Sequence, residues 1–150
     1  MRVLATACLL SGAFAVAAQL IPVDLSSPPV TGDLVAPTEV THILRSACYD
    51  CHSNETAWPW YSTIAPVSWL IHRDVEAGRQ RLNFSEWADY LSDPETAAQK
   101  LTEIAAVMTR GDMAPWYYRL LHPGARLMPE DRALLIRWAT VETLAQRAPR

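Results

Sequence analysis

The feature that most constrains this chain is a run of five residues, Cys48-Tyr49-Asp50-Cys51-His52. It has the CxxCH form that attaches haem c to a polypeptide. Two thiols three positions apart, at the end of a helix, can each bond to one vinyl-derived carbon on the same porphyrin edge. The imidazole that follows can then reach the iron. We therefore expect Cys48 and Cys51 to carry thioether bonds to one haem c, and His52 to be its proximal axial ligand.

Two other chemistries use closely spaced cysteines. A thioredoxin-like CxxC normally follows a strand within a βαβ pattern, and no such pattern is visible. A zinc site would need four ligands, drawn from the motif together with His72 or His122, and the chain has no second CxxC pair. Covalent haem is therefore the favoured interpretation.

Length and composition exclude several broad classes. A chain of 150 residues suits one domain. With 13 basic and 16 acidic side chains the formal charge is −3, Lys100 is the only lysine and there is no basic cluster, so we expect no nucleic-acid partner. Six tryptophans and five tyrosines supply material for a core, which argues against disorder. Three cysteines are too few for a disulfide scaffold.

The N-terminus has the form of an export signal. Met1-Arg2 is a short basic start, residues 3–18 carry no charge, and Ala15-Val16-Ala17 is a typical cleavage pattern. The alternative is an uncleaved membrane anchor that ends before Pro22. We divide the chain into a signal peptide or anchor (1–18), an extended tether (19–37) and a haem-binding domain (38–150). Export agrees with the motif, because haem c is attached outside the cytoplasm.

The rest of the sequence predicts an all-α domain, because no strand-length alternation of apolar and polar residues is present. We expect helices at 39–47 with Thr38 as N-cap, at 67–81, and at 86–91. A fourth should start from a capping box at Ser92 and end at Gly111. A proline-cut loop (112–128) precedes a last helix that opens at Pro129. The apolar stripe expected on that last helix comprises Leu134, Leu135, Trp138, Val141 and Leu144.

The sixth iron ligand has several candidates, namely Met108, Met113, Met128, His42, His72 and His122. Met113 is favoured because it lies in a Gly/Asp/Pro loop before the final helix, 61 residues after His52, where the distal methionine of small c-type cytochromes lies. Met108 shares a helical face with Leu101 and Ile104, so it is better explained as core. His122 is the alternative axial ligand, and an open five-coordinate iron is a third possibility.

Residues near the motif offer further contacts to a haem. Arg79, Arg81 and Asn83 can pair with propionates through charge-assisted hydrogen bonds, although an exposed helix-end role is equally natural for the arginines. The aromatic run at 58–61 can cover a haem edge or form ordinary core.

Several longer stretches resemble one known family. They are 19–23, 48–60 (CYDCHSNETAWPW), 65–69, Asp74-Val75 with Gly78-Arg79, 82–87, and Gly111-Asp112-Met113 with His122-Pro123. Together they resemble the haem-binding domain family of bacterial periplasmic or membrane-anchored proteins related to c-type cytochromes. The resemblance implies covalent haem at Cys48 and Cys51 with His52 proximal. The family tends to show Met-Pro-Pro where this chain has Met113-Ala114-Pro115, and the methionine is kept.

These features predict a small, exported, cytochrome c-like helical domain wrapped on one haem. The leading function is one-electron transfer in the periplasm to or from a redox partner protein there or in the membrane. No acid–base pair or nucleophilic triad is legible, so an electron carrier is favoured over an enzyme. The alternatives are a haem-based sensor and a small peroxidase-like enzyme, both of which require an open iron face.

Overall fold

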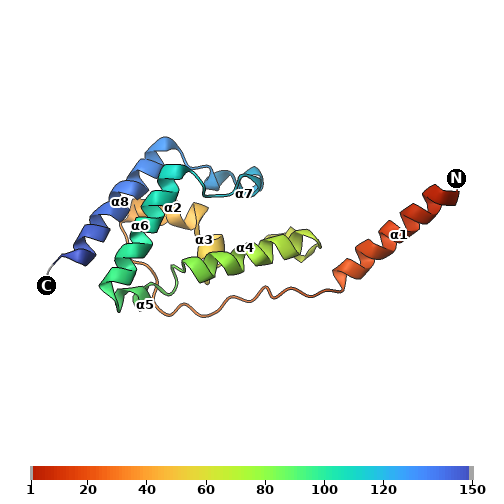
Figure 1. Cartoon of the computed structure of the whole chain (residues 1–150), viewed down its shortest axis with the longest axis horizontal. Coiled ribbons are helices and arrows are strands. Elements are labelled where there is room, and N and C mark those ends of the chain that lie inside the picture. Colours follow the sequence, from red (N-terminus) through yellow and green to blue (C-terminus); the bar gives the residue numbers. More distant parts are fainter. Residues whose placement is uncertain (1, 149–150) are drawn as a thin grey trace.

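The structure is a computed structural model that describes residues 2–148, and within that range it is all-helical, as expected. The elements are α1 (Arg2–Gln19), α2 (Thr38–Ala47), α3 (Tyr49–His52), η1 (Trp60–Thr63), α4 (Val67–Arg81), α5 (Trp87–Leu91), α6 (Pro94–Arg110), α7 (Trp116–Leu121), η2 (Pro123–Ala125) and α8 (Pro129–Arg147). Helix α1 projects from a compact body formed by the other elements (Figure 1).

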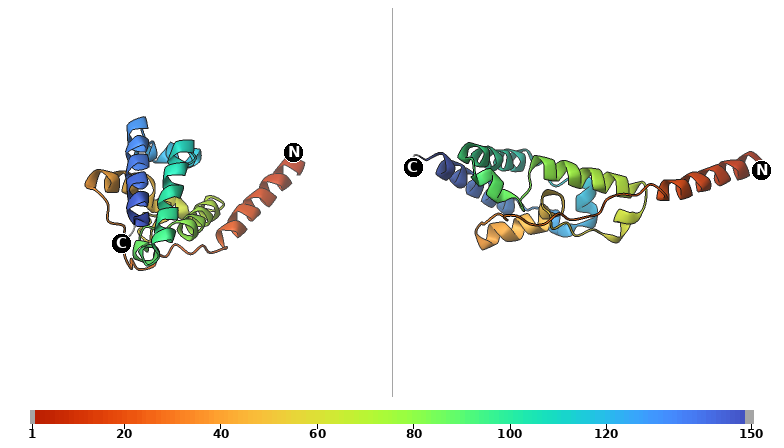
Figure 2. Two further views of the ribbon diagram at one scale, coloured as in Figure 1. Left: turned by 60° about the vertical axis from the view of Figure 1, so that its left-hand side comes forward. Right: turned by 90° about the horizontal axis from the view of Figure 1, so that it is seen from below.

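Helices α6 and α8 run side by side in opposite directions and form the scaffold of that body (Figures 1 and 2). Their facing residues are buried and comprise Ala97, Ala98, Leu101, Ile104 and Met108 on α6, and Leu135, Trp138, Ala139 and Thr143 on α8. The expected stripe on α8 is therefore partly wrong, because Val141 and Leu144 are exposed. The helix turns Ala139 and Thr143 toward α6 instead, so small side chains allow close helix packing.

A stack of aromatic rings joins this scaffold to the first half of the body. Tyr49 stacks on Phe84 with ring centroids 5.1 Å apart, and Phe84 stacks on Trp87 at 6.2 Å. Phe84 is almost completely buried. The stack fixes α3, the 82–86 loop and α5 together, and aromatic pairs of this kind contribute about 0.5–1.5 kcal/mol beyond the area that they bury.

Three of the expected helix starts and loops differ from the structure. Helix α2 begins at Thr38 with Pro37 as N-cap, and α6 is capped by Asp93, whose carboxylate accepts hydrogen bonds from the backbone of Glu95 and Thr96. Asp93 is one residue closer to Pro94 than Ser92 is, and its two oxygens can serve two amides. The segment 112–128 is not simply a loop, because it contains α7 and η2.

The stretch before α2 is extended, and much of it lies against the body. Thr31, Gly32 and Leu34 donate backbone hydrogen bonds to Ser85 or Phe84, and the Leu34 side chain is buried. Asp33 accepts a hydrogen bond from the Tyr49 hydroxyl. These contacts hold the extended segment beside the CxxCH motif.

Candidate functional site

A cavity of about 530 Å³ lies between α3, α4, α6 and the 113–122 segment. Its walls are mostly apolar, and it is within the ~300–1,000 Å³ range of sites that bind small molecules and cofactors. All five residues favoured as haem contacts from the sequence line it: Cys48, Cys51, His52, Met113 and His122. Residues separated by up to 74 positions thus meet on one cavity, although their individual roles stay predictions.

The CxxCH motif forms a separate helical turn. Helix α2 ends at Ala47, and the backbone of Cys48 (φ −126°) leaves the helix before α3 begins. The amides of Cys51 and His52 both donate to the Cys48 carbonyl, which closes the turn. Burial is the main cause that raises the pKa of each thiol to about 12. At neutral pH both thiols are therefore protonated.

His52 has one ring nitrogen committed to the protein. Its Nδ1 lies 3.0 Å from the Gly78 oxygen and 3.1 Å from the Leu82 oxygen. Both partners are carbonyls, so Nδ1 must carry the proton and donate, which leaves Nε2 as the unprotonated, metal-binding nitrogen. Burial lowers the pKa of His52, which favours the neutral imidazole that ligates metals.

Gly78 lets helix α4 approach the motif closely. A Cβ at this position would lie 2.3 Å from the Cys51 carbonyl oxygen and 3.2 Å from the Cys51 Cβ. Only a residue without a side chain leaves this room. The same residue supplies a carbonyl to His52, so the close approach and the orientation of the imidazole have one cause.

The candidates for the sixth iron ligand differ in whether they line the cavity and how far they are buried. Met113 lies in the loop after α6, lines the cavity and is 37% exposed. Met108 also lines the cavity, but it is buried within the core against α8. Met128 caps α8, and neither it nor His42 or His72 lines the cavity. His72 instead donates from Nδ1 to the Asp24 carbonyl.

His122 is held in a defined orientation on the cavity wall. Its ring stacks on Tyr118 with centroids 3.8 Å apart and planes within 6°. Its Nδ1 lies 3.0 Å from the backbone carbonyl oxygen of Tyr118, so this nitrogen carries the proton and donates the hydrogen bond. Its Nε2 is 3.5 Å from the Tyr61 hydroxyl, a contact at the limit of hydrogen bonding.

Tyr117 and Tyr118, which were not predicted from the sequence as site residues, connect α7 to two carboxylates that line the cavity on α3 and α4. The Tyr118 hydroxyl donates to Asp50 at 2.5 Å, and the Tyr117 hydroxyl donates to Asp74 at 2.6 Å. Burial and the Asp50 carboxylate raise the pKa of Tyr118 far above its usual value, so it stays a donor. The apolar sequence 116–121 (WYYRLL) was the available signal for a short helix here.

Of the other residues expected to contact haem, some line the cavity and others do not. Arg79 is engaged elsewhere, because it donates to the Ser53 carbonyl and the Thr56 hydroxyl, and Asn83 is buried against Asn54. Arg81 lines the cavity, and its exposed side chain forms a 3.6 Å ion pair with the half-buried Glu103. Of the 58–61 run, Pro59 and Tyr61 line the cavity, whereas Trp58 and Trp60 do not.

A zinc ion would need four ligands, drawn from the motif together with His72 or His122. Within residues 2–148, no group of three or more His, Cys, Asp or Glu side chains is arranged to hold a metal ion. The soft and imidazole donors that line the apolar cavity, two histidines, two cysteines and two methionines, suit a porphyrin with axial ligands.

An all-helical domain with a CxxCH motif and candidate axial ligands around one apolar cavity defines a class of haem-binding proteins. Comparison with known proteins agrees, because the chain matches the haem-binding domain family over residues 13–141 and belongs to it. The chain is also 27% identical over 95 residues to the cytochrome c peroxidase Ccp of Escherichia coli (strain K12). That match covers 63% of this chain and 20% of the relative. No solved structure matches.

Proposed function

We propose that this protein is a one-electron carrier with a single covalently bound haem c. Cys48 and Cys51 would carry the thioether bonds, His52 would bind the iron through Nε2, and Met113 would be the distal ligand. The observation that carries the proposal is the His52 ring, whose Nδ1 is fixed by two carbonyls while Nε2 is left for a metal at a cavity that both cysteines and Met113 line.

Bound haem would supply an iron that cycles between Fe(III) and Fe(II). The residues of the chain would tune this couple. A thioether is a soft ligand that stabilises the reduced iron relative to a second histidine. The apolar walls exclude water, which also favours the less charged state. Arg81 at the cavity edge is the residue best placed to pair with a propionate.

The proposed location is the periplasm. Helix α1 is long and apolar enough to cross a membrane, as both an export signal and an anchor would be. Its single basic residue is Arg2, at the end that would stay in the cytoplasm. The redox partner would then be a protein of the periplasm or of the membrane.

A second function, reaction of an open iron with peroxide or a diatomic gas, is favoured by one observation. His122 lies on the same cavity with its Nε2 near the Tyr61 hydroxyl, so a base and a hydroxyl group share that wall. The partial similarity to a protein named as a cytochrome c peroxidase points the same way.

The reaction with carbon monoxide separates the two functions. The full chain, matured in a host that attaches haem, is reduced and its optical spectrum is recorded before and after addition of carbon monoxide. A carrier with Met113 bound should be reversibly reduced, show a low-spin spectrum and change little. A high-spin protein that binds carbon monoxide at once, or is oxidised by peroxide in a His122-dependent way, would overturn the electron-carrier proposal.

A further inference from the structure

One end of the domain is unusually free of charge. Residues 56–72 contain no Asp, Glu, Lys or Arg, although such residues make up 19% of the chain. Two large apolar side chains of this segment, Trp60 and Ile64, are 78% and 42% exposed, and neither lines the haem cavity. Exposed apolar surface without nearby charge commonly marks a site of contact with a protein or a membrane.

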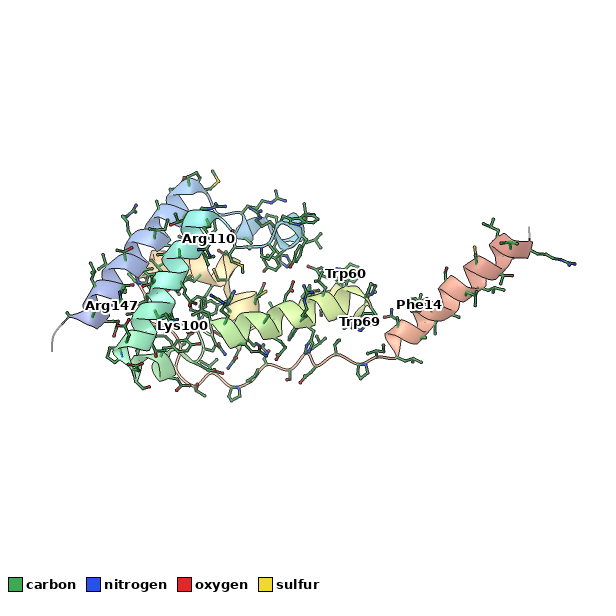
Figure 3. The ribbon with its side chains drawn as sticks, viewed as in Figure 1. Phe14, Trp60, Trp69, Lys100, Arg110 and Arg147 are labelled. Carbon is green, nitrogen blue, oxygen red and sulfur yellow. The ribbon has the colours of Figure 1, made fainter. Side chains whose placement is uncertain are left out.

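This end of the domain is attached to the end of α1. The Gln19 side chain makes two hydrogen bonds with the backbone of Ala65: its Nε2 donates to the Ala65 oxygen at 3.1 Å, and its Oε1 accepts from the Ala65 amide at 3.1 Å. Figure 3 shows Trp60 and Trp69 at the end of the body that faces α1. Next to Gln19, Leu20 and Ile21 are also exposed, at 78% and 57%. We name Leu20, Ile21, Trp60 and Ile64 the apolar tip.

The length of α1 determines where the apolar tip would lie. Eighteen helical residues extend about 27 Å, close to the ~30 Å hydrocarbon core of a bilayer. If α1 spans the membrane, its last residue, Gln19, lies at the membrane surface. The paired backbone of Ala65 must then lie at the same level. Tryptophan is one of the two residue types, with tyrosine, that are enriched in this interfacial region.

We propose that the apolar tip rests in the lipid headgroup region, so that the haem domain lies against the bilayer rather than free on a tether. The inference depends on retention of α1 as an anchor, one of the two roles proposed for it above. It places the η1–α4 side of the domain at the membrane surface, and Pro59 and Tyr61 of the same segment line the haem cavity. The cavity would then lie next to the bilayer, within reach of a membrane-embedded redox partner.

Spin labels at three positions test this arrangement in the full chain reconstituted in phosphatidylethanolamine–phosphatidylglycerol vesicles. Cys8 is a native, exposed cysteine within α1. Thr63 is exposed beside the apolar tip, and its hydroxyl donates to the Trp60 carbonyl. Thr140 is its matched control, an exposed threonine on α8 whose hydroxyl likewise donates to a backbone carbonyl. The two threonines are replaced by cysteine in a Cys8→Ser background. Haem is kept oxidised in every sample, because a reductant would consume both the oxygen and the nitroxide.

The proposal predicts that a label at Cys8 collides with oxygen in the hydrocarbon and is shielded from a water-soluble nickel chelate. The Thr63→Cys label should also collide more with oxygen and less with the nickel chelate than a label in water, but to a smaller degree than the Cys8 label. The Thr140→Cys label should collide with both reagents as a label in water does. Adding Ile64→Asp should shift the collision rates of the Thr63→Cys label toward those of the Thr140→Cys label. Adding Leu144→Asp on α8 should leave them unchanged.

Two results would overturn the inference in distinguishable ways. A Cys8 label outside the hydrocarbon would show that α1 does not span the bilayer. A Cys8 label within the hydrocarbon, together with identical behaviour of Thr63→Cys and Thr140→Cys, would show that α1 is an anchor and that the domain lies away from the lipid. Neither result would bear on haem binding, which the optical spectrum tests separately.

Discussion

The carbonyl oxygen of Gly78 lies 3.0 Å from Nδ1 of His52, and the Cα of the same glycine faces Cys51 where a Cβ would not fit. Gly78 thus limits the distance between α4 and the CxxCH turn, and together with the Leu82 carbonyl it sets the tautomer of the proposed proximal ligand. The site is therefore built by helix packing as much as by the motif.

The first prediction concerns this glycine. Gly78→Ala should push α4 away from α3, because the new Cβ would lie 2.3 Å from the Cys51 oxygen. We expect the free energy of unfolding to fall by about 1–3 kcal/mol, as for other overpacked sites, and less haem to be bound. Gly124→Ala is the control, since its Cβ would have no neighbour closer than 3.7 Å. Equal stability and equal haem content in the two variants would refute the role given to Gly78.

The second prediction concerns covalent attachment. The double variant Cys48→Ser, Cys51→Ser should lose all haem staining on a denaturing gel, because no thiol remains at the cavity to form a thioether bond with the porphyrin. Cys8→Ser should keep it, since Cys8 lies in α1, outside the domain. Staining that survives in the double variant would mean that haem is not attached through this motif.

The third prediction concerns the dependence of stability on pH through Tyr117. Its hydrogen bond to Asp74, helped by burial, raises the pKa of Tyr117 from 10.0 to about 12. Below pH 10 the phenol is protonated in both the folded and the unfolded state, so its contribution is complete. As the pH rises above 10 the unfolded state loses its proton first, so the free energy of unfolding falls until the folded state also titrates.

Urea unfolding at about pH 9 and about pH 11 measures this loss. Tyr117→Phe should lose less stability between the two pH values than the wild type does, because it has no proton to lose. Asp74→Asn should also lose less, because the carboxylate that raises the pKa is gone. If Tyr117→Phe loses as much as the wild type, the alkaline sensitivity arises elsewhere in the chain.

Much of the fold could be predicted from the sequence because its signals are local. The spacing of apolar residues predicted α2, α4, α5, α6 and α8 to within a few residues, and Gly111 ends α6 with a positive φ of 74° as expected. The all-α class is confirmed. The exact caps were less predictable, because Ser92 and Asp93 both suit an N-cap and only the geometry selects between them.

The predictions from the sequence were wrong where packing between distant segments determines the local structure. Helix α7 has only six residues and depends on the Asp50 and Asp74 carboxylates for its position, so its own pattern is weak. The burial of Leu34 and the exposure of Val141 follow from how segments pack, which periodicity cannot specify.

The candidate site shows the same division. The residues of the CxxCH motif could be selected from the sequence because their chemistry requires a fixed spacing. That Met113 and His122 line the same cavity as the motif, and that Gly78 and Tyr118 hold two of the histidines, depends on the tertiary fold. The sequence could name the ligand candidates, but only the structure shows which share a cavity with His52.

The most direct test of the account is the optical spectrum of the oxidised protein, wild type and Met113→Ala. The wild type should show the weak near-infrared band that marks methionine bound to Fe(III), and Met113→Ala should lack it. Met128→Ala, a methionine outside the cavity, should keep the band. A wild-type spectrum without the band that changes on His122→Ala and not on Met113→Ala would contradict the account and make His122 the axial ligand.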